Sequence, residues 1–152
     1  RHEGRGSSGR RGTSLVKLGG ARSRRVGRPE FDFDRQETLT TTLETVHPVA
    51  VVNAAAWTHV DLAESEPEAA ARANTFGPAE LARLCAQRDI PLIHISTDYV
   101  FAGDKGVPYV ETDNISPQTV YGATKAEGEK LALAANPKTL ILRTSWVYSA
   151  HG

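Results

Sequence analysis

Short apolar runs alternate with stretches of helical pattern along most of this chain. The runs have few polar side chains and cover residues 49–53, 92–96 and 139–144. Continuous runs of this kind are typical of strands that are buried on both faces of a parallel sheet. Helical patterns precede or separate them at residues 38–46, 61–74, 78–88 and 119–135, and a Gly- and Pro-containing loop covers 103–117. The alternation predicts an α/β fold with a Rossmann-like, doubly wound parallel sheet.

The amino-terminal end fits this pattern poorly. A dinucleotide-binding unit needs a strand immediately before its glycine turn, but only three residues precede Gly4. The expected second strand, at residues 21–26, is mostly arginine and serine and has little apolar surface to bury. We therefore divide the chain into an irregular Arg- and Gly-rich start, residues 1–30, and an incomplete NAD(P)-binding domain, residues 31–152, that lacks its first strand.

Charge is unevenly distributed, although the 152 residues carry a net charge of zero. Residues 1–28 hold nine arginines and lysines against one acid, Glu3. A basic arm can bind nucleic acid, but no aromatic side chains lie between these arginines, and phosphate binding by a cofactor site is the nearer interpretation. No apolar run approaches the ~20 residues of a membrane span, so we expect no membrane partner.

The cysteine and histidine positions argue against two kinds of site, an intrachain disulfide and a metal site built by the protein. Cys85 is the only cysteine, so no intrachain disulfide can form, and its helical spacing from Leu81 and Leu84 predicts that it is buried. This usage is compatible with a reducing cytoplasm. The histidines form no pair with ligand spacing, so we predict no metal site built by the protein, and His94 should pack within its strand.

Tyr121 and Lys125 are the most informative pair. Four residues apart on a helix, they share one face. An ammonium beside a phenol lowers the pKa of that phenol, which can then exchange a proton with a substrate oxygen. The hydroxyl of Thr97, just after an apolar run, can hold the same oxygen, while hydride must come from a cofactor. The alternative for so short a motif is a solvated helix face.

Candidate cofactor contacts lie upstream of this pair. Gly6, Gly9 and Gly12 have the spacing of a turn that lets a pyrophosphate approach backbone N–H groups; glycine-rich disorder is the alternative. Arg28 can accommodate a 2′-phosphate, which favours NADP, or can be a solvated loop residue. Asn53 ends an apolar run, so its backbone should face the cofactor crevice. Asn74 can have a structural role between helix and sheet.

Four segments carry a resemblance to a known family: residues 52–64, 94–101, 120–125 and 142–148. With them, the chain from about residue 31 to 152 resembles the extended short-chain dehydrogenase/reductases and, among these, the dTDP-4-dehydrorhamnose reductase family. The resemblance implies that NADPH or NADH reduces the C4 ketone of dTDP-6-deoxy-L-lyxo-4-hexulose to dTDP-L-rhamnose. It also allows a homodimer, and some members hold a magnesium ion between subunits.

The resemblance also implies roles for single residues. Thr97 would bind the carbonyl oxygen, Tyr121 would donate the proton, and Lys125 would hold the nicotinamide ribose and tune Tyr121. Ala54, Ala55 and Thr58 would line the cofactor cleft. Asp32 and Phe33 would lie beside the adenine of the cofactor, and Tyr99 and Trp146 beside the sugar.

Departures from the family leave other readings open. Arg10 and Arg11 replace the usual Gln-Leu of the glycine turn, and the chain has about half the family's length, without its C-terminal substrate domain. We therefore expect a fragment, with a frameshifted or misread start. One alternative is a non-catalytic NADP-binding regulatory subunit, and another is an inert fragment of low stability. A third is a sugar-nucleotide epimerase or dehydratase, because a dehydratase usually has an acid directly after its catalytic hydroxyl and Asp98 stands at that position.

Overall fold

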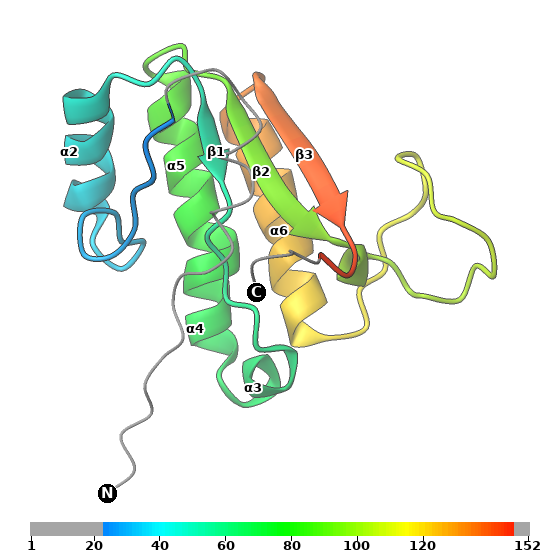
Figure 1. Ribbon diagram of the computed structural model, residues 1–152. Coiled ribbons are helices and arrows are strands. Elements are labelled where there is room, and N and C mark those ends of the chain that lie inside the picture. Colours follow the sequence, from blue (N-terminus) through cyan, green and yellow to red (C-terminus); the bar gives the residue numbers. More distant parts are fainter. Residues whose placement is uncertain (1–22, 148–152) are drawn as a thin grey trace, which may run out of the picture.

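The computed structural model describes residues 23–147 and shows a parallel sheet backed by helices (Figure 1). The sheet has three strands in the order β1 (Val51–Asn53), β2 (Leu92–Thr97) and β3 (Thr139–Thr144). Both pairings are parallel, with Asn53 opposite His94 and Thr97 opposite Thr144. The predicted Rossmann-like α/β class is confirmed, and the three apolar runs are the three strands.

Helices connect the strands in the manner of parallel crossover units. Their bounds, in chain order, are α2 Gln36–Val46, α3 Val60–Ser65, α4 Pro67–Ala71, the π-helix η1 Arg72–Phe76, α5 Gly77–Ala86, the 3₁₀ helix η2 Asp98–Val100 and α6 Val120–Ala135. The helices predicted at 38–46, 78–88 and 119–135 are confirmed within a few residues. The loop predicted at 103–117 contains neither helix nor strand.

The single helix predicted for residues 61–74 is wrong. The chain forms α3, breaks at Glu66, restarts as α4 with Pro67 in its first turn, and continues as the π-helix. Proline is well suited to a first helical position because it has no N–H to donate, and the same lack interrupts a helix that would run through it. The alanine-rich composition indicated the helical state but not this interruption.

The core lies between the sheet and the α2–α5–α6 layer. Leu39, Leu81, Cys85 and Leu92 are each at most 1 % exposed and belong to one cluster. The prediction that Cys85 is buried is confirmed, and burial raises the pKa of its thiol to about 11. No helix within residues 23–147 is long and apolar enough to cross a membrane.

The opposite face of the sheet is open within the described residues. Val52, Leu140 and Leu142 are 51 %, 54 % and 41 % exposed, and Figure 1 shows α5 and α6 together behind the strands. The expectation that these runs are buried on both faces is therefore not met by residues 23–147. The reason is geometric, because alternate side chains of a strand point to opposite faces and only one face is covered here.

Close packing brings α6 against the π-helix. A Cβ atom added at Gly128 would overlap the backbone carbonyl oxygen of Asn74, and one added at Gly122 would overlap that of Tyr99. Only glycine allows these two approaches. The position of α6 relative to η1 and η2 therefore depends on the absence of a Cβ atom at Gly122 and Gly128.

Gly128→Ala should destabilise the fold. In a helix without neighbours this change is stabilising by about 1 kcal/mol, whereas overpacking against the Asn74 carbonyl should cost about 2 kcal/mol net. Denaturant unfolding monitored by circular dichroism measures the difference. Gly27→Ala is the matched control, because an added Cβ there meets nothing within 4 Å. A stabilised Gly128→Ala variant would contradict the packing described above.

Candidate active site

Helix α6 carries Tyr121 and Lys125 on its buried face. The hydroxyl oxygen of Thr119 caps the helix by accepting a hydrogen bond from the Gly122 N–H at 3.0 Å. Tyr121 therefore lies in the first turn and Lys125 one turn later, and the two side chains are 9 % and 2 % exposed. The solvated-face reading of the Tyr-x-x-x-Lys motif is wrong, because both members are buried.

Lys125 points at the sheet. Its Nζ donates to the carbonyl oxygen of Ile95 in β2 at 2.7 Å. Burial lowers the pKa of Lys125 to about 8, and the carboxylate of Glu129 opposes this effect. Sequence reasoning expected the ammonium beside the Tyr121 phenol; the structure adds an anchor on the strand that the motif did not indicate.

Thr97 lies where β2 ends and η2 begins. Its Oγ1 accepts from the Tyr99 N–H and donates to Oδ1 of Asp98, each at 3.2 Å. The Ser145 hydroxyl donates to the other Asp98 oxygen at 2.7 Å. The Tyr99 ring meets the Tyr121 ring edge to face, with centroids 5.5 Å apart. Through Tyr99, the fold brings η2 and the first turn of α6 to the carboxyl edge of the sheet, which is where such folds bind ligands.

Asn53 and His94 form a buried pair across β1 and β2. Oδ1 of Asn53 accepts from the Ala55 N–H at 3.0 Å, so its Nδ2 donates to Nδ1 of His94, also at 3.0 Å. This orientation assigns the imidazole proton to Nε2. Burial, with the Lys125 charge nearby, lowers the pKa of His94 to about 3, so the ring is neutral. The prediction that His94 packs within its strand is confirmed.

Asn74 joins the loop after β1 to α6. Its Oδ1 accepts from the Trp57 N–H at 2.9 Å, and its Nδ2 donates to the Trp57 carbonyl and to Oγ1 of Thr124, both at 3.2 Å. The side chain is fully buried. The sequence suggested a structural role for Asn74 but not these partners, because a helix residue gives no signal of a contact fifty positions away.

Residues 54–59 leave the carboxyl end of β1 as a loop. Ala54 and Ala55 are exposed and Thr58 is half-buried. Small exposed side chains beside an anchored asparagine leave the backbone at this edge accessible to a ligand.

The remaining predicted residues are less closely gathered. Arg28 forms ion pairs with Asp32 at 3.0 Å and Asp34 at 2.8 Å, so its charge already has acidic partners. No strand is found at residues 23–26. Trp146 is 80 % exposed and has a positive φ of 49°. The glycine triplet Gly6, Gly9 and Gly12 lies outside the described residues.

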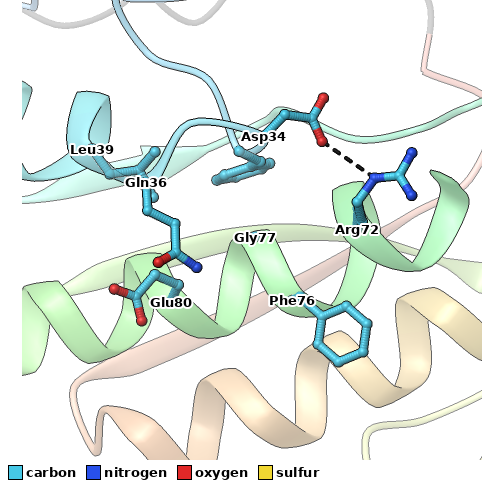
Figure 2. A pocket seen from close by; sticks show the side chains of 8 residues that line it. Asp34, Gln36, Leu39, Arg72, Phe76, Gly77 and Glu80 are labelled. Carbon is cyan, nitrogen blue, oxygen red and sulfur yellow. Dashed lines mark ion pairs between the residues drawn. The ribbon is translucent and has the colours of Figure 1, made fainter. Parts of the chain in front are cut away.

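A separate pocket of about 280 Å³ lies between α2 and the start of α5. Figure 2 shows its lining, with Asp34 and Arg72 joined by an ion pair of 3.4 Å. Phe33 is part of this lining, and its ring fills the space above Gly77. None of Thr97, Tyr121 and Lys125 lines the pocket, so it is not where the catalytic candidates meet.

The described part of the chain contains no cluster of metal-ligating side chains. Within residues 23–147, no three His, Cys, Asp or Glu side chains gather as a metal ion would require. These residues therefore give no support to the magnesium ion that the family resemblance suggests.

The His94→Asn variant should lose less of its free energy of unfolding in acid than the native chain does. The folded chain resists protonation of His94 down to about pH 3, while the unfolded chain takes up that proton below its ordinary value of 6.5. Stability therefore falls as the pH drops between these values, by on the order of a few kcal/mol in total. Unfolding titrations at several pH values measure the slope. The exposed His47→Asn variant is the control, and equal slopes for both variants would contradict the buried neutral ring.

Comparison with known proteins agrees with this geometry. A dTDP-4-dehydrorhamnose reductase from Sinorhizobium fredii is 48 % identical over 127 residues, which are 84 % of this chain and 43 % of that protein. The crystal structure of such a reductase from Clostridium acetobutylicum superposes with a TM-score of 0.83 at 34 % identity, over 90 % of this chain and 49 % of the other.

A third relative was solved with a cofactor. The Bacillus anthracis dTDP-4-dehydrorhamnose reductase in complex with NADP gives a TM-score of 0.78 at 33 % identity, over 81 % of this chain and 44 % of the other. The chain thus spans about half the length of the relatives it matches. The family described as the RmlD substrate binding domain matches residues 5–152. This chain, with its buried tyrosine–lysine pair behind a parallel sheet, belongs to that family.

Proposed function

We propose that this chain carries the catalytic residues of an NAD(P)H-dependent reductase that converts dTDP-6-deoxy-L-lyxo-4-hexulose to dTDP-L-rhamnose. The observation that supports the proposal most is the packing of α6 against β2 and η2, in which the Tyr121 ring meets the Tyr99 ring and Lys125 donates to Ile95. Thr97 lies at the end of the same strand and accepts from the Tyr99 N–H. Relatives that share this part of the chain are named dTDP-4-dehydrorhamnose reductase.

The reaction adds a hydride and a proton to the C4 ketone, and the bound nicotinamide supplies the hydride when present. Tyr121 donates the proton to the carbonyl oxygen as charge develops on it. The Thr97 hydroxyl, which now donates to Asp98 at 3.2 Å, turns that hydrogen towards the substrate oxygen and holds it. The product is an alcohol, and Tyr121 is left to regain its proton from solvent.

Lys125 supplies positive charge beneath the reacting groups. Its ammonium is fixed on the Ile95 carbonyl, so it loses little side-chain freedom when a ribose hydroxyl binds beside it. Because burial brings the pKa of Lys125 to about 8, the group can also exchange a proton close to physiological pH. While it is protonated, the Lys125 ammonium favours ionisation of the Tyr121 phenol.

The cofactor is held by the carboxyl edge of β1. We assign the cleft to Asn53, Ala54, Ala55 and Thr58, with the adenine beside Asp32 and Phe33. Gly6, Gly9 and Gly12 would hold the pyrophosphate. Arg28 remains the candidate for a 2′-phosphate, although its ion pairs with Asp32 and Asp34 would then have to be exchanged. NADPH and NADH are both candidates.

Tyr99 and Trp146 are the candidates for contact with the sugar. Tyr99 is 44 % exposed and Trp146 is 80 % exposed, and Tyr99 adjoins the Tyr121 ring. Exposed aromatic faces suit the apolar faces of a sugar. A cytoplasmic homodimer remains part of the proposal.

A sugar-nucleotide dehydratase is the second candidate, because Asp98 follows Thr97 as an acid would in that class. In the structure both carboxylate oxygens of Asp98 accept hydrogen bonds, from Thr97 and from Ser145. An acid that must give a proton to the substrate would have to leave these partners. The Asp98 geometry therefore favours the reductase, with Asp98 as a support for Thr97.

The experiment that tests the function begins with the cofactor. NADPH and NADH are titrated into the full chain by calorimetry, and saturable binding is expected. The dTDP-sugar is then added, and oxidation of the reduced cofactor is followed at its near-ultraviolet absorbance band. Binding without turnover would favour a non-catalytic regulatory subunit. Absence of binding would mean that this chain shares the family's motifs but not its activity.

Tyr121→Phe should reduce turnover by roughly 10²–10⁴-fold, the usual contribution of a positioned general acid. Cofactor affinity should change little, since the phenol acts on the substrate oxygen. Tyr109→Phe is the matched control, because that hydroxyl bonds only the 103–104 loop and Asp104. Near-normal turnover by Tyr121→Phe would rule out Tyr121 as the acid.

A further inference from the structure

A third side chain continues the row formed by Tyr121 and Lys125 on α6. Glu129 lies one further turn along the helix and is 2 % exposed. Among residues 23–147 it is the one carboxylate that is buried. Residues four apart on a helix are close neighbours on one face, so Glu129 stands next to Lys125 in the layer between α6 and the sheet.

Arg143 of β3 holds this carboxylate in place. Its Nε donates to both Glu129 oxygens at 3.1 and 3.2 Å, and its Nη2 donates to one of them at 2.7 Å. The same guanidinium lies 5.1 Å from the centre of the Phe101 ring, in the segment that follows η2. An arginine that forks onto a carboxylate in this way fixes the position of that carboxylate.

Few other charges reach Lys125. Its Nζ donates to the Ile95 carbonyl, and none of the carboxylates within residues 23–147 forms an ion pair with it. Seven elements pack against α6, and each carries titratable groups: Glu80, Arg83 and Cys85 on α5, Arg72 on η1, Glu68 on α4, Asp61 and Glu64 on α3, Asp98 and Tyr99 on η2, His94 on β2 and Arg143 on β3. The carboxylates among them are exposed, apart from Glu80, which is half-buried. The His94 imidazole is neutral, and Arg143 is paired to Glu129. Glu129 is therefore the buried negative charge available to Lys125.

We propose that Glu129 is a positioning residue for Lys125, its carboxylate held by Arg143 so that it balances the buried Lys125 ammonium against β2. Without that charge, an ammonium in this layer is opposed by burial and by the Arg143 guanidinium together. The role is electrostatic and acts through Lys125; Glu129 itself touches neither substrate nor cofactor in the proposed reaction. The inference rests on the proposed function only for its effect on turnover.

The test measures the titration of Lys125 itself. The full chain is prepared with ¹³C-labelled lysine, and the Lys125 signal is identified by its loss in Lys125→Arg. In the native chain Lys125 should titrate near pH 8, as burial with the opposing effect of Glu129 indicates. In Glu129→Gln its midpoint should fall by about one pH unit or more, since an opposite charge this close favours the charged form.

Two variants separate charge from packing. Glu127→Gln is the matched control on the same helix, because Glu127 is exposed and pairs with Lys130, and its Lys125 midpoint should equal that of the native chain. Glu129→Asp keeps the charge but loses reach to Arg143, so the melting temperature should fall while the midpoint stays close to native. Equal midpoints for Glu129→Asp and Glu129→Gln would overturn the proposal.

The readout does not depend on catalysis, so it stands or fails separately from the proposed function. A folded Glu129→Gln chain whose Lys125 midpoint equals that of the native chain would overturn the proposal. If Glu129→Gln does not fold, Arg143→Gln keeps the carboxylate and removes the opposing guanidinium, so the Lys125 midpoint should rise. A fall of the midpoint in Arg143→Gln would overturn the proposal. Where turnover is detected, its alkaline limb should move with the Lys125 midpoint.

Discussion

Burial of the Lys125 ammonium is the constraint on which the candidate site depends. A charged amine almost free of solvent contact needs a fixed acceptor and an opposite charge nearby. The acceptor is the Ile95 carbonyl of β2, and the opposite charge is the carboxylate of Glu129, which Arg143 holds from β3. Helix α6 is thereby tied to two neighbouring strands by polar contacts in addition to apolar packing. The orientation of Tyr121, one turn before Lys125, follows from the same ties.

Close backbone approach makes these contacts possible. Gly122 and Gly128 let α6 lie against the carbonyls of Tyr99 and Asn74. The π-helix sets the buried side chains of Asn74 and Thr75 against α6, where Thr75 donates to the Thr124 carbonyl at 2.7 Å. π-helical turns inside α-helices are frequent at functional sites. Here the turn links the loop after β1, the side proposed to face the cofactor, to the helix that carries the catalytic candidates.

The electrostatic character of the layer beneath α6 is distinctive. Burial and the nearby Lys125 charge lower the pKa of His94 to about 3, so the ring is neutral and adds no positive charge beside Lys125. The single buried carboxylate of the described residues lies at the other end of the row. The arrangement places one buried ammonium a single helical turn after Tyr121, the proposed proton donor.

The sequence alone determined the fold class, the three strands, three of the helices and the spacing of Tyr121 and Lys125, because each of these is a local property of hydrophobic period, proline placement or helical repeat. It could not show that Pro67 interrupts one helical stretch, that the stretch ends as a π-helix, or that one face of the sheet is open in residues 23–147. Only the tertiary structure decided the contacts between Asn53 and His94, Asn74 and Trp57, and Glu129 and Arg143. Each of these contacts joins two separate segments. A hydrogen bond between distant segments produces no periodic pattern in the sequence, so it cannot be predicted from the sequence alone.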